Sequence, residues 1–187
     1  TGAAFAGVRS MTATSGGGFS LMVEGMGLAA MIEAPIVIVN VQRPGPATGL
    51  PTRTEQGDLR FMLHASQGDF PRIVLAPGDV KECFELTFQA FNLAEKYQCP
   101  VIVLSDKYLA ESKITAEPFE YKHLAVDRGK LLKEAELTGL KNFVRFQFTD
   151  DGVSPRSVPG MENAVYRVSS DEHQENGVVN EEPENRR

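Results

Sequence analysis

The sequence has 187 residues, of which 42% are hydrophobic and 24% charged, and its formal net charge is −6. These values are typical of a globular protein that is long enough for one domain with a substantial core. They argue against a general nucleic-acid-binding protein, because no basic stripe is present to neutralise phosphates, and against a membrane protein, because no apolar run is long enough to cross a bilayer.

The first part of the chain predicts a strand, a turn, a helix and a second strand. Residues 8–14 alternate loosely between apolar and polar side chains, which favours a strand. Three consecutive glycines at 16–18 predict a turn, because glycine stabilises no regular element. Residues 19–32 have a broad apolar surface typical of a buried helix, and the apolar run 36–41 predicts a buried parallel strand.

The glycine turn at residues 15–18 is the first candidate site. Glycines before a helix expose backbone N–H groups that can bind phosphate. However, the sequence lacks the complete glycine-rich motifs of nucleotide-binding loops. We therefore favour close approach of this backbone to another ligand, or to a partner chain, over a nucleotide phosphate site.

The loop at residues 42–61 is the second candidate site. Its prolines and glycines exclude regular structure over most of its length. It leaves the carboxyl end of a predicted parallel strand, where open α/β sheets bind ligands. Arg43, Arg53 and Arg60 cluster around it, and a forked guanidinium suits a carboxylate or a phosphate. Two alternatives stay open: an ordinary surface loop, or arginines that pair with Glu55 and Asp58.

The middle of the chain repeats the strand–helix–strand pattern. We predict a short helix at 59–65, a turn at 66–71 and a strand at 72–76. A long amphipathic helix, N-capped by Asp79, continues to about Tyr97 and is followed by a strand at 100–105. The predicted fold over residues 1–119 is therefore α/β, with three layers: a mostly parallel sheet that carries helices on both faces.

Residues 120–187 form what we call the C-terminal extension. Its pattern is irregular, with a possible helix at 130–140, an alternating segment at 144–148 that predicts an edge strand, and polar loops at 150–160 and 169–177. Such a segment either wraps a partner or leads to a further domain. Because the chain starts without a methionine and has no closing element, we expect a piece of a longer polypeptide whose domain lacks its N-terminal part.

Few other residues suggest chemistry. His64, His123 and His173 lie far apart in the sequence, and Cys83 and Cys99 lack the spacing of a metal or cluster site. We therefore predict no metal site in this chain and interpret the cysteines as buried thiols in a reducing cytoplasm. No G-x-S-x-G motif supplies a hydrolase nucleophile.

Three motifs resemble the alpha subunit of 2-oxoacid:ferredoxin oxidoreductases. They are T-A-T-S-G-G-G-F-S-L-M at 12–22, V-Q-R-P-G-P-A-T-G-L-P-T at 41–52 and T-E-Q-G-D-L at 54–59, in the order and spacing of that family. The segments D-G-V-S-P-R at 151–156, P-G at 159–160 and S-D-E-H at 170–173 also resemble it. The resemblance covers most of the chain.

The resemblance implies the pyrimidine-binding domain of a thiamine-diphosphate enzyme, at residues 1–119. The implied reaction is oxidative decarboxylation of 2-oxoglutarate or a related 2-oxoacid, with coenzyme A taking the acyl group and ferredoxin the electrons. Thiamine diphosphate and Mg²⁺ would be shared with or held by a beta subunit, which would also hold a 4Fe–4S cluster. This chain lacks the G-D-G motif for the Mg-diphosphate and the cluster cysteines, and the expected location is cytoplasmic.

The resemblance also assigns residues. Arg43 is expected to bind the substrate carboxylate, assisted by Thr48 and Gly49. The turn residues Thr14, Ser15, Gly16 and Gly17 are expected to contact the cofactor. Two positions depart from the family, because Gly17 stands for a proline and Ala47 for a serine.

The family's acidic E-D-E stretch and its Y-P-I-T-P segment are absent from the sequence. The glutamate that activates the aminopyrimidine is expected upstream, so we expect no catalytic residue in this chain. We expect the turn at 15–18 and part of the chain after Ile114 to contact the beta subunit, and the chain alone to bind neither iron nor thiamine diphosphate tightly. Two other functions stay open: a non-catalytic α/β scaffold or interaction module, and the pyrimidine domain of a transketolase-like enzyme.

Overall fold

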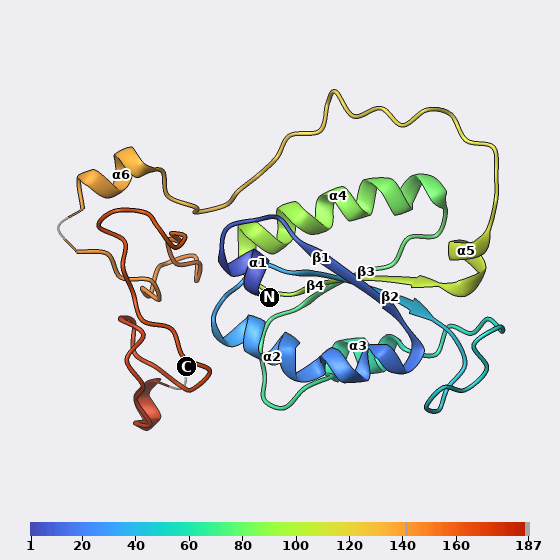
Figure 1. Ribbon diagram of the computed structural model, residues 1–187, viewed down its shortest axis with the longest axis horizontal. Helices are drawn as coiled ribbons and strands as arrows, with labels where there is room; N and C mark the ends of the chain where they lie inside the picture. The colour runs from blue at the N-terminus through green and yellow to red at the C-terminus, as the bar shows by residue number, and fades with distance from the viewer. Residues whose placement is uncertain (141, 186–187) are drawn as a thin grey trace.

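The computed structural model describes residues 1–140 and 142–185 and contains one sheet of four parallel strands (Figure 1). The strands lie in the order β1-β2-β4-β3. Their bounds are Met11–Ser15 for β1, Val37–Gln42 for β2, Ile73–Leu75 for β3 and Val101–Asp106 for β4. The predicted parallel sheet is confirmed.

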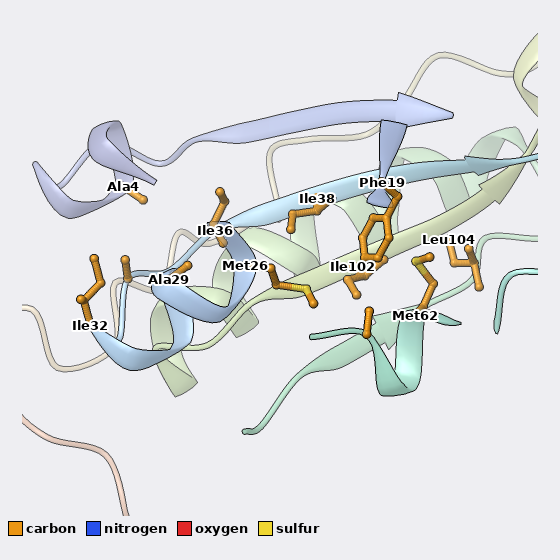
Figure 2. Close-up of a cluster of buried hydrophobic side chains, with 12 residues drawn as sticks. Ala4, Phe19, Met26, Ala29, Ile32, Ile36, Ile38, Met62, Ile102 and Leu104 are labelled. Carbon is orange, nitrogen blue, oxygen red and sulfur yellow. The ribbon is translucent and has the colours of Figure 1, made fainter. Parts of the chain in front are cut away.

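Helices cover both faces of this sheet, as predicted. Helix α4 (Val80–Tyr97) packs on one face, and α2 (Val23–Met31) and α3 (Leu59–His64) pack on the other (Figure 1). Because side chains alternate along a strand, Val37 and Val101 lie in the core under α4, whereas Ile38 and Ile102 lie in the core next to α2 and α3. Figure 2 shows the second core, where Met26 of α2 and Met62 of α3 meet the strand residues. The three-layer α/β fold is therefore confirmed.

Helix α4 begins and ends where the sequence predicts. The carboxylate of Asp79 accepts a hydrogen bond from the backbone N–H of Glu82 at 2.8 Å, as an N-cap residue does. The helix ends at Tyr97, and Gln98 follows with a left-handed φ of 51°. Ala90 and Ala94 are buried against the sheet. Glu95 is also buried, which the amphipathic pattern did not predict.

The predicted helix at 19–32 is shorter than expected. Two 3₁₀ turns, η1 (Gly16–Gly18) and η2 (Ser20–Met22), precede α2. Between them, Phe19 is 1% exposed and packs edge-on against Phe61 of α3, with ring centroids 5.4 Å apart. Burial of this ring between the turn and α3 therefore accompanies the tight turns that replace the first turns of the helix. Two other short helices are α1 (Gly2–Phe5) and α5 (Lys107–Glu111).

The C-terminal extension has little regular structure in its described residues, 120–140 and 142–185. It contains α6 (Glu134–Thr138), shorter than the helix predicted at 130–140, and η3 (Pro183–Asn185). The edge strand predicted at 144–148 is wrong: these residues form no strand, and Arg145 is 1% exposed. Its guanidinium donates hydrogen bonds to Glu33 and Gln98 of the α/β layers. The domain boundary near residue 119 stays a prediction.

Candidate functional site

The carboxyl ends of β1, β2 and β4 lie side by side. In the sheet register Ser15 of β1 pairs with Val41 of β2, and Gln42 of β2 pairs with Asp106 of β4. The glycine turn leaves β1 here, the loop at residues 43–58 leaves β2, and α5 follows β4 (Figure 1). The fold therefore brings together the two candidate sites that the sequence predicted separately.

Arg43 lies against the glycine turn. Its Nε donates a long hydrogen bond of 3.4 Å to Ser15 Oγ, and its Nη1 donates to the carbonyl of Thr48. Gly16 has a φ of +55°, and a Cβ placed on it would lie 2.6 Å from Arg43 Cζ. Only glycine meets both conditions, because other residues rarely adopt this φ and carry a side chain.

The other two glycines also allow close contacts within the chain. A Cβ on Gly17 would lie 3.2 Å from the carbonyl oxygen of Ala47, and one on Gly18 would overlap Thr14 Oγ1. The backbone of the turn therefore lies close to the chain's own loop and strand. The predicted approach of this backbone to a ligand or a partner chain stays a prediction.

The loop itself is folded tightly around Arg43. The peptide bond from Gly45 to Pro46 is cis, and Gly49 has a φ of +55°. The backbone N–H of Leu50 donates to the carbonyl of Pro44 at 3.1 Å, and a Cβ on Gly49 would overlap that same oxygen. These contacts hold Thr48 and Gly49, both exposed, beside the guanidinium of Arg43.

No carboxylate within the described residues lies at ion-pair distance from Arg43. In the described part of the chain, Arg53 and Arg60 do not pair with Glu55 or Asp58 either. The alternative in which the loop arginines pair with these two carboxylates is therefore wrong. Arg43 is half-buried, whereas Arg53 and Arg60 are exposed. Because Arg43 bonds to neutral oxygens alone, its positive charge remains available to an anion.

Exposed apolar side chains occur on the elements that form this site. No sequence pattern predicted them, although large apolar residues beside a polar loop are a signal for a contact surface. Leu21 of η2 is 89% exposed, and Leu50 of the loop is 58% exposed. Three more lie on α3: Leu59, Phe61 and Leu63.

The other residues weighed from the sequence form no site. Among the described residues, no group of three His, Cys, Asp or Glu side chains could hold a metal ion. Cys83 and Cys99 are free thiols, but only Cys99 is buried; the expectation of a buried Cys83 is wrong, since this residue is half-buried on α4. Burial raises the pKa of Cys99 to about 11. His173 packs on Phe146, with ring centroids 4.0 Å apart. Of the helices in the described part of the chain, none is both long and apolar enough to span a membrane.

Comparison with known proteins gives consistent matches over the whole chain. Residues 1–187 match the family model described as pyruvate flavodoxin/ferredoxin oxidoreductase, thiamine diP-bdg, a thiamine-diphosphate-binding domain. The alpha subunit of 2-oxoacid:ferredoxin oxidoreductase 1 from Sulfurisphaera tokodaii is 50% identical over 187 residues, which are 99% of this chain and 29% of that protein. The 2-oxoglutarate synthase subunit KorA from Methanothermobacter thermautotrophicus is 46% identical over 155 residues, which are 81% of this chain and 39% of that subunit.

A solved structure is also similar. It is a 2-oxoglutarate:ferredoxin oxidoreductase from Magnetococcus marinus with 2-oxoglutarate, coenzyme A and succinyl-CoA bound. The TM-score is 0.92 at 45% identity, and the match covers 99% of this chain and 32% of that chain. The chain thus spans about a third of the length of the proteins that it matches.

Proposed function

The chain belongs to the pyruvate flavodoxin/ferredoxin oxidoreductase family, and from this premise we propose that it is the pyrimidine-binding domain of the alpha subunit of a 2-oxoacid:ferredoxin oxidoreductase. The proposed activity is coenzyme A-dependent oxidative decarboxylation of a 2-oxoacid, with ferredoxin as electron acceptor and a cytoplasmic location. The names of KorA and of the Magnetococcus enzyme support 2-oxoglutarate or a related 2-oxoacid as the substrate.

The observation that carries this proposal is the state of Arg43. Its guanidinium is fixed by Ser15 Oγ and the Thr48 carbonyl, and it has no carboxylate partner in the described part of the chain. Every 2-oxoacid has a carboxylate next to the reacting carbonyl, and a forked guanidinium can hold it through two hydrogen bonds. In this role Arg43 orients the carboxylate that leaves as carbon dioxide, while the Thr48 hydroxyl and the Gly49 backbone assist from the same loop.

The glycine turn fits a role beside the cofactor through its exposed edge. Ser15 is exposed at the end of β1, and Thr14 precedes it in the same strand. Gly16 and Gly17 contact Arg43 and Ala47 on the sides where a Cβ would project, so a cofactor would meet their backbone and the Ser15 hydroxyl. When bound, thiamine diphosphate stabilises the carbanion that decarboxylation generates. The turn would place substrate-binding Arg43 next to it.

The remaining groups are proposed to come from outside these residues. We assign Mg²⁺ and the 4Fe–4S cluster to a beta subunit, because this sequence has neither the G-D-G motif nor the cluster cysteines. The exposed Leu21, Leu50 and Phe61 support a subunit contact beside the turn, since apolar groups gathered around a polar site are typical of interfaces. Part of the chain after Ile114 is proposed to join this contact.

The test is steady-state kinetics of the complete complex carrying Arg43→Ala. Removing one charged partner of a buried hydrogen-bonded pair costs about 2–4 kcal/mol, which corresponds to a loss of roughly 30- to 1000-fold in catalytic efficiency. Arg43→Lys should recover part of this loss, because an ammonium cannot reproduce the fork.

Arg167→Ala is the matched control, because it removes an equal charge from an exposed arginine of the C-terminal extension. The control should keep wild-type efficiency. If Arg43→Ala also stays within about threefold of wild type for every 2-oxoacid, Arg43 does not bind the substrate. If the wild-type complex reduces no ferredoxin with any 2-oxoacid, the scaffold function is the better assignment.

A further inference from the structure

The loop that carries Arg43 is held from below by two buried side chains of β2. Asn40, which is 0% exposed, donates from Nδ2 to Asp58 Oδ2 at 3.1 Å. Gln42, which is 6% exposed, accepts at Oε1 from the backbone N–H of Asp58 at 3.0 Å. The end of the loop is thereby fastened to the strand from which the loop starts, so residues 43–57 form a closed arch.

Asp58 makes this contact in place of a local one. It occupies the N-cap position of α3, yet its side chain forms no capping hydrogen bond. Asp79 and Asp106, at the same position of α4 and α5, both accept from the first turn of their helices. Since an aspartate at an N-cap ordinarily stabilises its own helix, the carboxylate of Asp58 serves the contact with β2 instead.

Asn40 is a polar residue in apolar surroundings, and its hydrogen bond to Asp58 is the feature that accounts for it. It lies on the same face of β2 as Ile38, in register with Leu104 of β4, and both of these are buried apolar residues. Its Oδ1 is buried and accepts no hydrogen bond from the described residues. A buried acceptor without a donor costs stability that an apolar side chain would not. The bond to Asp58 is therefore what this asparagine supplies.

A second attachment fixes the loop to the neighbouring strand. Gln56 donates from Nε2 to Asp106 Oδ2 at 2.8 Å, and Asp106 also accepts from the backbone N–H of Leu109 at 2.9 Å. Burial alone would raise the pKa of Asp106, but the hydrogen bonds from Leu109, Gln56 and the Tyr108 backbone together outweigh it and lower the pKa. Asp106 is thus a charged, fixed acceptor for the loop.

We propose that Asn40, Gln42 and Asp58 form a clasp that, together with the Gln56–Asp106 bond, positions the Arg43 loop for substrate binding. The clasp sets the height of the arch over the strand ends, and so sets where the Arg43 guanidinium lies relative to Ser15 and Gly16. These are positioning residues, which act through Arg43 without touching the substrate. The inference rests on the proposed role of Arg43 and goes beyond it by naming what holds that residue in place.

The experiment compares Asp58→Ala with Asp58→Asn in the complete complex. Asp58→Ala removes the acceptor of the hydrogen bond from Asn40, which should displace the loop and with it Arg43. The KM for the 2-oxoacid should then rise about ten- to a hundredfold. Asp58→Asn keeps a side-chain oxygen for Asn40 Nδ2 and should return this KM to within about threefold of wild type. The KM for coenzyme A should stay unchanged in both variants. Glu55→Ala, which removes an exposed carboxylate from the same loop, is the matched control.

Hydrogen exchange on the same proteins gives a readout that does not depend on turnover. Amides of residues 43–57 should exchange faster in Asp58→Ala and at the wild-type rate in Asp58→Asn, with β2 protected in both. Equal 2-oxoacid KM values and equal loop exchange in wild type and Asp58→Ala overturn the clasp and leave the proposed function intact. A wild-type complex without 2-oxoacid turnover overturns the proposed function, and the exchange rates then decide on the clasp alone.

Discussion

Arginines have opposite roles at the carboxyl edge of the sheet, where the parallel strands end, and at its amino edge, where they begin. At the carboxyl edge, Arg43 is half-buried and its guanidinium bonds to a hydroxyl and a backbone carbonyl. At the amino edge, Arg145 is 1% exposed and donates to the Glu33 carboxylate at 2.6 Å. It also donates to Glu33 O, Gln98 Oε1 and Ser154 Oγ.

Glu95 shows the pattern of the amino edge most strongly. This carboxylate, 3% exposed at the end of α4, lies within 3.4 Å of Arg9, 2.8 Å of Arg128 and 3.0 Å of Arg156. Arg128 and Arg156 belong to the C-terminal extension, so their ion pairs attach it to the α/β layers. An arginine whose charge is matched inside the protein stabilises the fold, whereas Arg43 has no carboxylate partner among the described residues.

The largest effect is expected from removing the shared carboxylate. Glu95→Gln leaves three guanidinium groups, one of them almost fully buried, without their counter-ion. Breaking a buried ion pair in this way costs about 3–5 kcal/mol, so the free energy of unfolding, measured with urea, should fall by that amount. Glu85→Gln on the same helix removes an exposed partner of Lys81 and should change stability by less than about 1 kcal/mol. Equal effects of the two variants would contradict this account of the amino edge.

A smaller loss is expected when Arg145 keeps its charge but loses its shape. A lysine cannot reach the Glu33 carboxylate, Gln98 and Ser154 at once, so Arg145→Lys leaves at least one buried acceptor unsatisfied. The expected cost is about 1–3 kcal/mol, and hydrogen exchange should increase in residues 142–157. Arg167→Lys, at an exposed position, is the control. Unchanged stability of Arg145→Lys would mean that charge alone attaches the extension.

Arg43→Ala should have a still smaller effect on stability, in contrast to its effect on catalysis. Arg43 has no carboxylate partner among the described residues, so its removal leaves no buried charge unpaired. The free energy of unfolding should therefore change by less than about 0.5 kcal/mol. Thermal or urea unfolding of wild type and variant side by side would measure this. A loss as large as that of Arg145→Lys would show that Arg43 is structural, like the arginines of the amino edge.

The smallest effect concerns an exposed ion pair inside the extension. Hydrogen bonds from Lys130 and Thr149 lower the pKa of Asp151 from 3.8 to about 2. Because the folded pKa lies below the unfolded one, this group stabilises the fold above about pH 4, and the contribution is lost as the pH falls towards 2. Asp151→Asn should remove this part of the pH dependence of unfolding between pH 4 and 2. A wild-type-like pH profile in the variant would contradict the assignment.

Local patterns in the sequence were enough to predict the layers of the fold. The apolar runs of β2 and β4 predicted buried strands, and Asp79 followed by an amphipathic stretch predicted α4. The same patterns placed Arg43 and its loop at the carboxyl end of a parallel strand, where open α/β sheets bind ligands, and gave the glycine turn as a separate candidate site. These features depend on neighbouring residues, and the sequence by itself determines them.

Only the tertiary structure decided which charges are paired. The alternation at 144–148 suggested an edge strand, but Arg145 is buried and pairs with Glu33, which lies 112 residues away in the sequence. Glu95 interrupts the apolar face of α4, and it pairs with Arg156, which lies 61 residues further along the chain. The contact of Arg43 with Gly16 and the hydrogen bond from Asn40 to Asp58 likewise join separate segments. Hydrophobic periodicity reports burial along one element, whereas a buried charge is tolerated only beside a partner that the fold supplies.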